Sequence, residues 1–176
     1  MVDALSWYIL AVVVAAVPVV RSVAPPSSAE AIVVTDTTFA DKNTQSAMAA
    51  DLIAFAQTLK GTPYKYACSD PKRGFDCSGF VMYVFNHFEM AVPRSSIAFT
   101  NIGQEVDIEQ AQPGDVILFT GTDASVRKVG HVGIITQGGD SLSFIHASSG
   151  KTYSVTETVL NPHYKKRFIK VVRLLK

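Results

Sequence analysis

Cysteine is scarce in this chain of 176 residues, in which Cys68 and Cys77 are the only two. One pair of cysteines cannot form the several disulfide bonds that stabilise small secreted domains. A bridge between the two would close a short loop and stabilise little, so free thiols are the main interpretation. Because no cysteine precedes Cys68, we also expect no lipid attachment at a processed N-terminal cysteine.

An excess of charge of either sign is also missing. The chain has 16 Lys and Arg against 15 Asp and Glu, a formal net charge of +1. The basic residues between Lys165 and Arg173 alternate with apolar ones, as on the solvent face of a strand. This balance gives no sign of a nucleic-acid partner, and we expect none.

The only long apolar run lacks the usual preceding positive charge. Leu5 to Val20 contains no charged residue, no Lys or Arg precedes it, and Asp3 stands before it. Sixteen residues are few for a membrane span of about 20, and Ala29-Glu30-Ala31 offers a small-residue cleavage site. We expect residues 1–31 to be a signal peptide removed on export, with an uncleaved membrane anchor as the alternative.

Proline and serine precede the segment 32–43, which we interpret as a linker with a possible strand at 32–34. A domain is expected over 44–176, starting with a helix from Ser46 to Lys60 and a second from Cys77 to about Met90. Strands are expected at Val116 to Phe119, His131 to Gln137, Ser141 to Ala147, Tyr153 to Thr158 and Phe168 to Leu175. Helices followed by closely spaced strands predict an α+β fold with an antiparallel sheet of about five strands.

The segment around Cys77 combines a helix start with a potential nucleophile. Asp76 is a favourable N-cap residue, and Val81, Val84 and Phe88 follow at helical spacing. The free N–H groups and positive dipole end of a helix favour a thiolate over a thiol. Cys77 is therefore a candidate nucleophile, with a small buried core residue as the alternative.

Two histidines lie on strands that flank Gly138-Gly139. If these glycines form a two-residue turn, Gln137 pairs with Asp140 and His131 lies directly opposite His146, with Cβ atoms about 5 Å apart. A longer loop would place them diagonally, still within imidazole reach. We expect His131 to accept the proton of the nucleophile, giving a thiolate–imidazolium pair, and His146 to fix its tautomer. The reverse assignment of the two remains open.

Other roles for these histidines are possible. Both could be packed core residues, or both could join the two cysteines in a zinc site, although the cysteine spacing does not match the usual short one. His87 and His163 have no polar constellation near them in sequence and are expected to be structural.

Six short segments occur in order over about 130 residues. They are Gly61-Thr62-Pro63-Tyr64, Gly74-Phe75-Asp76-Cys77-Ser78-Gly79-Phe80, Pro93-Arg94-Ser95-Ser96, Gln112-Pro113-Gly114-Asp115, Gly130-His131-Val132-Gly133 and Phe144-Ile145-His146-Ala147-Ser148. With these segments the chain resembles the NlpC/p-sixty family of papain-like cell-wall cysteine peptidases. Any one segment is weak alone, but the ordered set is specific.

The resemblance implies a papain-like fold and a Cys-His-His triad of Cys77, His131 and His146. It implies hydrolysis of peptidoglycan stem peptides, typically between γ-D-glutamate and a diamino acid, through a thioester acyl-enzyme. No metal or organic cofactor is implied. We expect a monomer in the bacterial cell envelope (periplasm or cell wall) or secreted.

The resemblance also implies a set of substrate-binding residues. They are Tyr64, Tyr66, Asp76, Ser78, Ser95 and Ser96. Tyr64 looks like the family's active-site tyrosine, and Asp76 and Ser96 like the groups that meet the amino end of the stem peptide. Tyr66 stands where a tryptophan often lines the cleft, and Ser95 where Asp or Thr is frequent.

The chain departs from the family at Ala67-Cys68, where Gly-Gly or Ala-Gly is usual, and this leaves the cleft shape and redox sensitivity open. Two other functions remain possible. One is an amidase or acyltransferase on the same scaffold, acting on another amide or on a lipid. The other is a non-catalytic wall-binding protein.

Overall fold

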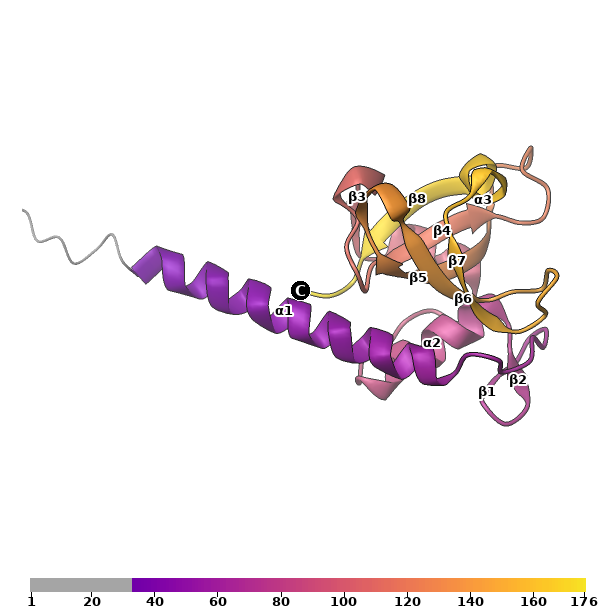
Figure 1. The fold of residues 1–176 in the computed structure, drawn as a ribbon, viewed down its shortest axis with the longest axis horizontal. Helices are drawn as coiled ribbons and strands as arrows, with labels where there is room; N and C mark the ends of the chain where they lie inside the picture. Colours follow the sequence, from indigo (N-terminus) through magenta and orange to yellow (C-terminus); the bar gives the residue numbers. More distant parts are fainter. Residues whose placement is uncertain (1–32) are drawn as a thin grey trace, which may run out of the picture. The chain divides into compact units, whose positions relative to one another are not determined.

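The computed structural model describes residues 33–176 and, within the first helix, the side chains from Lys42 onward. It consists of helices and a six-stranded sheet of order β3-β8-β4-β5-β6-β7, in which all neighbours are antiparallel (Figure 1). The helices are α1 (Val33–Thr58), α2 (Cys77–His87) and α3 (Pro162–Arg167). The sheet strands are β3 (Gln104–Val106), β4 (Val116–Thr120), β5 (Val129–Gln137), β6 (Ser143–Ala147), β7 (Val155–Val159) and β8 (Phe168–Arg173). The predicted α+β class is confirmed.

The helix α1 begins earlier than the sequence predicted. Val33 opens it, so the strand expected at 32–34 is wrong for the residues that the structure describes, and the segment 32–43, expected to be a linker, is helical from Val33 onward. The physical reason is that no glycine or proline interrupts residues 33–58. Leu52 and Ala56 of α1 are buried in the core, and Gln45 Nε2 donates a hydrogen bond to the carbonyl oxygen of Leu175 at 2.8 Å.

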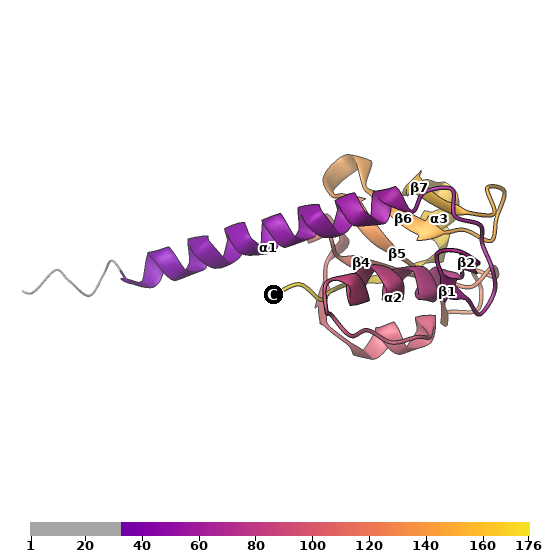
Figure 2. The same ribbon diagram turned by 90° about the horizontal axis from the view of Figure 1, so that it is seen from below.

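The two faces of the sheet carry separate cores because side chains alternate along each strand. On one face, Phe80 and Val84 of α2 pack with Val132 and Ile134 of β5. Both α1 and α2 lie on this side of the sheet (Figures 1 and 2). On the other face, residues such as Phe119 form a second apolar cluster against which α3 packs. The position of α2 over β5 brings its N-terminus to the predicted site.

Strand β5 contains an irregularity just before His131. Phe119 of β4 pairs with His131, but Thr120 pairs with Val129, so Gly130 is an extra residue in β5. A side chain at Gly130 would meet the backbone of Gly121 at 2.8 Å, and glycine is therefore required there. Bulges of this kind redirect neighbouring side chains.

The register of β5 with β6 differs from the direct opposition predicted for the two histidines. Ile134 pairs with Ile145, and continuing this register places His146 beside Gly133, two positions from His131. The connection is longer than a two-residue turn because Gly139 starts a 3₁₀ turn that ends at Ser141. The diagonal arrangement is therefore the correct one.

Three sequence expectations about the second half need correction. The edge strand β3 was not predicted, because three residues are too few to show an alternating pattern. With β3 the sheet has six strands and not about five. Lys165 to Arg167 belong to α3 and not to a strand, since Asn161 caps a helix there by accepting bonds from the N–H groups of His163 and Tyr164. Arg167 is buried and does not face solvent.

A small ribbon, β1 (Ser69–Asp70) with β2 (Gly74–Phe75), precedes α2. No helix within residues 33–176 has both the length and the apolar character needed to cross a bilayer. The expected signal peptide or anchor, with the run from Leu5 to Val20, lies outside the described residues.

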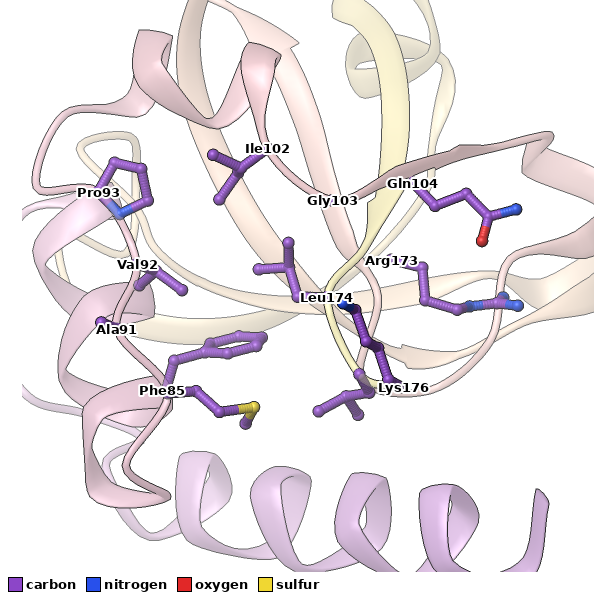
Figure 3. Close-up of a pocket in the computed structure, with 12 residues that line it drawn as sticks. Phe85, Ala91, Val92, Pro93, Ile102, Gly103, Gln104, Arg173, Leu174 and Lys176 are labelled. Carbon is purple, nitrogen blue, oxygen red and sulfur yellow. The ribbon is translucent and has the colours of Figure 1, made fainter. Parts of the chain in front are cut away.

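A hollow of about 850 Å³ lies away from the predicted site residues. Its walls are mainly apolar and come from the end of α2, the segment that follows it and the C-terminal strand (Figure 3). Phe85, Val92, Pro93, Ile102 and Leu174 line it. It contains none of the side chains assigned to catalysis or substrate binding.

Candidate active site

The start of α2 fixes the position of Cys77. Asp76 has extended backbone angles, and its Oδ1 accepts a hydrogen bond from the N–H of Gly79 at 2.7 Å. The predicted N-cap is confirmed, and Cys77 is the first helical residue. A side chain at Gly79 would collide with the carbonyl oxygen of Cys68, so this glycine lets the helix lie against the β1 segment.

The thiol of Cys77 is buried and directed at a backbone oxygen. It is 9% exposed, and Sγ lies 4.0 Å from the carbonyl oxygen of Gly130. Burial and, secondly, the charge of Asp76 raise the pKa of this thiol, although the N–H groups of Val132 and Ser78 oppose the shift. The expected preformed thiolate is therefore not favoured here, and sulfur keeps its proton.

The two predicted histidines are in direct contact. His131 Nε2 lies 2.8 Å from His146 Nδ1, and His146 Nε2 lies 3.0 Å from the hydroxyl oxygen of Thr158. Burial lowers the pKa of His131 well below its usual value and the pKa of His146 to about 3. The positive charge of Arg167 lowers both pKa values further. Both imidazoles are therefore neutral near pH 7.

The structure brings Cys77 next to the histidine pair without a thiol–imidazole bond. Sγ contacts Gly130, the residue that precedes His131, and no hydrogen bond joins Sγ to the His131 ring among residues 33–176. The contact between nucleophile and base thus stays a prediction. Since His131 Nε2 is occupied by His146, Nδ1 is the nitrogen left for that role.

All six predicted substrate-binding residues line one groove with Cys77. This groove, of about 420 Å³, is bounded by Tyr64, Tyr66, Ala67, Asp76, Cys77, Ser78, Arg94, Ser95, Ser96 and Gly130. The residues come from the segment before β1, the start of α2 and the turn before the helical segment Ser96–Asn101. The chain therefore assembles the predicted set from separate segments, although their roles in binding remain predictions.

Arg94 is a member of the groove to which sequence reasoning gave no role. Its Nη1 and Nη2 donate to Oδ1 and Oδ2 of Asp76 at 2.9 and 2.7 Å, and Nη1 also reaches the Ser78 hydroxyl at 3.2 Å. This two-pronged ion pair holds the carboxylate of Asp76 beside Cys77. The arginine stood in the quoted segment Pro93-Arg94-Ser95-Ser96, so the signal was present in the sequence.

Tyr64 provides a neutral hydroxyl at the groove. Burial, followed by the charges of Cys77 and Asp76, raises the pKa of Tyr64 to about 12. The hydroxyl therefore stays protonated across the neutral range and can donate a hydrogen bond. Tyr66, by contrast, is 83% exposed on the rim.

A second hollow, of about 240 Å³, opens at His131. Thr122, His131, Ser148, Ser149, Gly150, His163, Tyr164 and Arg167 line it. Sequence reasoning expected His163 to be structural and placed Arg167 on the solvent face of a strand, because α3 was not predicted. The hollow and the Cys77 groove are thus lined by consecutive residues of β5, Gly130 for the groove and His131 for the hollow.

The two cysteines are both free and buried, so the alternative of a bridge between them is not formed. The carbonyl oxygen of Cys68 accepts a bond from the N–H of Asp76 at 2.9 Å. Ala67 before it has φ of 56°, a left-handed conformation that favours glycine. In the described part of the chain no cluster of three or more His, Cys, Asp or Glu is arranged to hold a metal ion.

The model of the NlpC/P60 family matches residues 61–173, which contain the groove, α2 and the paired histidines. The chain belongs to the NlpC/P60 family. This confirms the resemblance drawn from the six ordered segments.

Relatives of this NlpC/P60 chain include a probable endopeptidase of Mycobacterium tuberculosis, 40% identical over 109 residues. The match covers 62% of this chain and 25% of that protein, so the chain spans about a quarter of the length of this relative. The probable endopeptidase NlpC of Escherichia coli is 33% identical over 67% of this chain and 73% of that protein. A gamma-DL-glutamyl hydrolase of Bacillus subtilis is 36% identical over 63% of this chain and 25% of its own length.

Solved structures of the family have the same fold. An NlpC/P60 family protein from Bacillus cereus superimposes with a TM-score of 0.64 at 33% identity, covering 73% of this chain and 40% of that one. The NlpC/p60 domain of the peptidoglycan hydrolase SagA gives 0.59 at 27% identity, covering 72% and 98%. The papain-like α+β fold of this chain is thereby confirmed.

Proposed function

We propose that this protein is a cysteine endopeptidase that hydrolyses peptidoglycan stem peptides at the bond between γ-D-glutamate and a diamino acid. The observation that carries the proposal is the juxtaposition at Gly130: the Cys77 thiol contacts its carbonyl, and the next residue, His131, is hydrogen-bonded to His146. Membership of the NlpC/P60 family supports the class of reaction. The name of the Bacillus subtilis relative, a gamma-DL-glutamyl hydrolase, supports the bond type.

The pKa directions favour proton transfer during attack over a preformed ion pair. Cys77 keeps its proton and His131 is neutral, so Nδ1 of His131 takes the thiol proton as sulfur bonds to the amide carbon. This step requires the Cys77 side chain to turn from the Gly130 carbonyl toward Nδ1 of His131. His146 holds the ring of His131 through Nε2 throughout.

The developing oxyanion lies at the start of α2. Backbone N–H groups of the first helical turn and the protonated Tyr64 hydroxyl are the available donors. When the intermediate collapses, the C–N bond breaks and the imidazolium of His131 protonates the leaving amine. Water, deprotonated by the same imidazole, then attacks the thioester and releases the γ-D-glutamyl carboxylate and the thiol.

The groove supplies a place for the amino end of the stem peptide. The Asp76 carboxylate, held by Arg94, and the hydroxyl of Ser96 face a substrate ammonium group. Since charge-assisted hydrogen bonds need a fixed partner, Arg94 keeps Asp76 in position for this contact. Tyr66 and Ser95 complete the walls, and Ser78 adds a hydroxyl beside Asp76.

We infer that the protein acts as a monomer outside the cytoplasm, in the cell envelope or secreted, with residues 1–31 as a signal peptide or membrane anchor. The cell-wall substrate supports this location. N-terminal sequencing of the mature protein distinguishes the two: a start near residue 30 indicates cleavage, and an intact Met1 indicates an anchor.

The decisive experiment compares purified wild type with Cys77→Ala on defined muropeptides, with products identified by mass spectrometry. Wild type should release the amino-terminal dipeptide that ends in D-glutamate, and Cys77→Ala should release none. Cys68→Ala is the matched control, because it removes the other buried thiol, and it should retain activity. Equal product from wild type and Cys77→Ala would refute the nucleophile assignment, and turnover of a lipid amide instead of muropeptides would indicate an acyltransferase or amidase.

A further inference from the structure

Arg167 is a buried cation beside the paired histidines. It is 9% exposed at the end of α3, and its guanidinium carbon lies 5.3 Å from the centre of the Tyr164 ring. Nε donates to the carbonyl oxygen of Gly121 at 2.8 Å and Nη2 to that of Thr120 at 3.0 Å. Nη1 lies 3.2 Å from Nε2 of His163. None of these partners carries a negative charge.

Buried charges in proteins are normally compensated by a partner of opposite sign. In the described region, two less buried arginines are each paired with a carboxylate: Arg94 forms a two-pronged pair with Asp76, and Arg173 with Asp115. No ion pair of residues 33–176 includes Arg167. A guanidinium carries five N–H donors, and three of these are used, so two remain for an anion.

The hollow in front of Arg167 suits such an anion. No Asp or Glu is among its lining residues, whereas Ser148, Ser149 and Thr122 provide hydroxyl groups. Its volume of about 240 Å³ is sufficient for a short carboxylate-bearing side chain. The planar fork of a guanidinium donates two parallel hydrogen bonds to a carboxylate, a match that a point donor such as an ammonium group does not offer.

The chemistry of the proposed reaction identifies what occupies this hollow. His131 protonates the leaving amine, so the residue that carries this amine lies beside His131 when the bond breaks. The acyl part and the amino end of the substrate occupy the Cys77 groove, which Gly130 lines, whereas the next residue, His131, lines the hollow. The side chain of the leaving residue is therefore next to the hollow that His131 lines together with Arg167.

We propose that this hollow binds a free carboxylate on the side chain of the diamino acid that leaves, and that Arg167 is the residue that selects it. The inference rests on the proposed function and narrows its substrate class. Stem peptides with a side-chain carboxylate, as in diaminopimelate, should be preferred over those with lysine, which has no carboxylate, and over those in which the carboxylate is amidated.

Matched substrates test this directly. Tetrapeptides of L-alanine, γ-D-glutamate, a diamino acid and D-alanine are prepared with meso-diaminopimelate, with its side-chain amide, and with L-lysine. The terminal D-alanine places the other carboxyl of the diamino acid in a peptide bond, so the acid and the amide differ only in one charge. We expect wild type to cleave the acid with kcat/KM at least about tenfold above the amide, the effect of one charge-assisted contact.

Variants of the full chain assign this preference to Arg167. In Arg167→Gln the acid-to-amide ratio should fall to about one, and in Arg167→Lys, which keeps the charge but not the fork, it should lie in between. Lys166→Gln is the matched control, because Lys166 lies on the same helix but is exposed, and it should keep the wild-type ratio. A purely structural role of Arg167 would lower cleavage of both substrates equally.

The outcomes separate this inference from the proposed function. Cleavage of all three tetrapeptides with equal kcat/KM by wild type overturns the role of the hollow and leaves the peptidase assignment intact. An unchanged acid-to-amide ratio in Arg167→Gln overturns it as well. Failure of wild type to cleave any of them overturns the function itself. If Arg167→Gln does not fold, as judged by circular dichroism, the wild-type ratio and Arg167→Lys decide the question.

Discussion

His131 Nε2 and His146 Nδ1 lie 2.8 Å apart, although their residues are diagonal and not opposite in the sheet. The bulge at Gly130 and the absence of a side chain at Gly133 accompany this contact. Thr158 of the neighbouring strand β7 holds the far side of the His146 ring. Three adjacent strands thus determine the orientation of the proposed base.

The first prediction concerns the partner of that base. In His146→Ala the ring of His131 loses its only side-chain hydrogen bond among the described residues, so we expect kcat on muropeptides to fall by roughly 10²–10⁴-fold with little change in KM. His87→Ala is the matched control, because His87 stacks on Phe55 away from the groove, and it should keep normal kcat. Unchanged kcat in His146→Ala would remove His146 from the proposed triad.

The second prediction tests the space beside His146. A Cβ at Gly133 would lie 2.8 Å from Phe144 Cδ2, 3.0 Å from the Ile145 carbonyl oxygen and 3.2 Å from His146 Cβ. Gly133→Ala should therefore displace His146, lower kcat by roughly tenfold or more, and destabilise the fold by about 1–3 kcal/mol. Gly121→Ala, where nothing lies within 4 Å, is the control for the loss of a glycine.

The measurement for that pair is kcat together with the free energy of unfolding in urea. A Gly133→Ala protein as active and as stable as Gly121→Ala would show that the sheet accommodates the methyl group. It would also show that the position of His146 does not depend on this close approach.

The third prediction concerns the thiol. Because the charge of Asp76 raises the pKa of Cys77, its removal in Asp76→Asn should lower that pKa. Asparagine is as good an N-cap as aspartate, so α2 should persist. The pH dependence of iodoacetamide alkylation, followed on the Cys77 peptide by mass spectrometry, should shift to lower pH. The exposed substitution Asp123→Asn should leave the profile in place, and an upward shift in Asp76→Asn would contradict the electrostatic account.

The fourth prediction is the pH dependence of stability. His131 and His146 have pKa values lowered by burial, so the unfolded chain binds more protons than the folded one below the usual histidine value of 6.5. Stability is therefore fully present above pH 6.5 and is lost as pH falls. Between pH 6 and 5 the free energy of unfolding should fall by up to about 1.4 kcal/mol per pH unit for each histidine.

Urea titrations at several pH values check this slope. His146→Ala should reduce it by about one proton, whereas His87→Ala serves as a comparison for the loss of an exposed histidine. A stability of wild type that stays constant from pH 7 to pH 5 would mean that the two histidines are not buried in neutral form.

Much of the site could be predicted from the sequence because its pieces are local. The cap at Asp76, the stripe that buries α2 and the ordered segments each depend on neighbouring residues. The histidine register could not be predicted, because it depends on the 3₁₀ turn at Gly139–Ser141. Arg94 and Arg167 received no role because their partners, Asp76 and the Thr120–Gly121 carbonyls, lie many residues away in the chain.

The helix start was expected to lower the pKa of the Cys77 thiol, whereas burial and the charge of Asp76 raise it. A sequence shows that a cysteine begins a helix but not that Asp76 and burial act on the same sulfur. Similarly, the beginning of α1 at Val33 shows that the composition of a segment, here polar and rich in threonine, does not by itself end a helix. In both cases local effects act in opposite directions, and only the three-dimensional structure shows which one is larger.

Ala67 has a left-handed backbone conformation, with φ of 56°, that suits glycine better than alanine. This alanine lines the Cys77 groove, and its left-handed conformation destabilises the folded state by about 1–2 kcal/mol. Ala67→Gly should recover part of this, about 0.5–1 kcal/mol after the greater freedom of unfolded glycine is deducted, and thermal melting would reveal it. Directed evolution for higher thermal stability would thus be expected to select Ala67→Gly early.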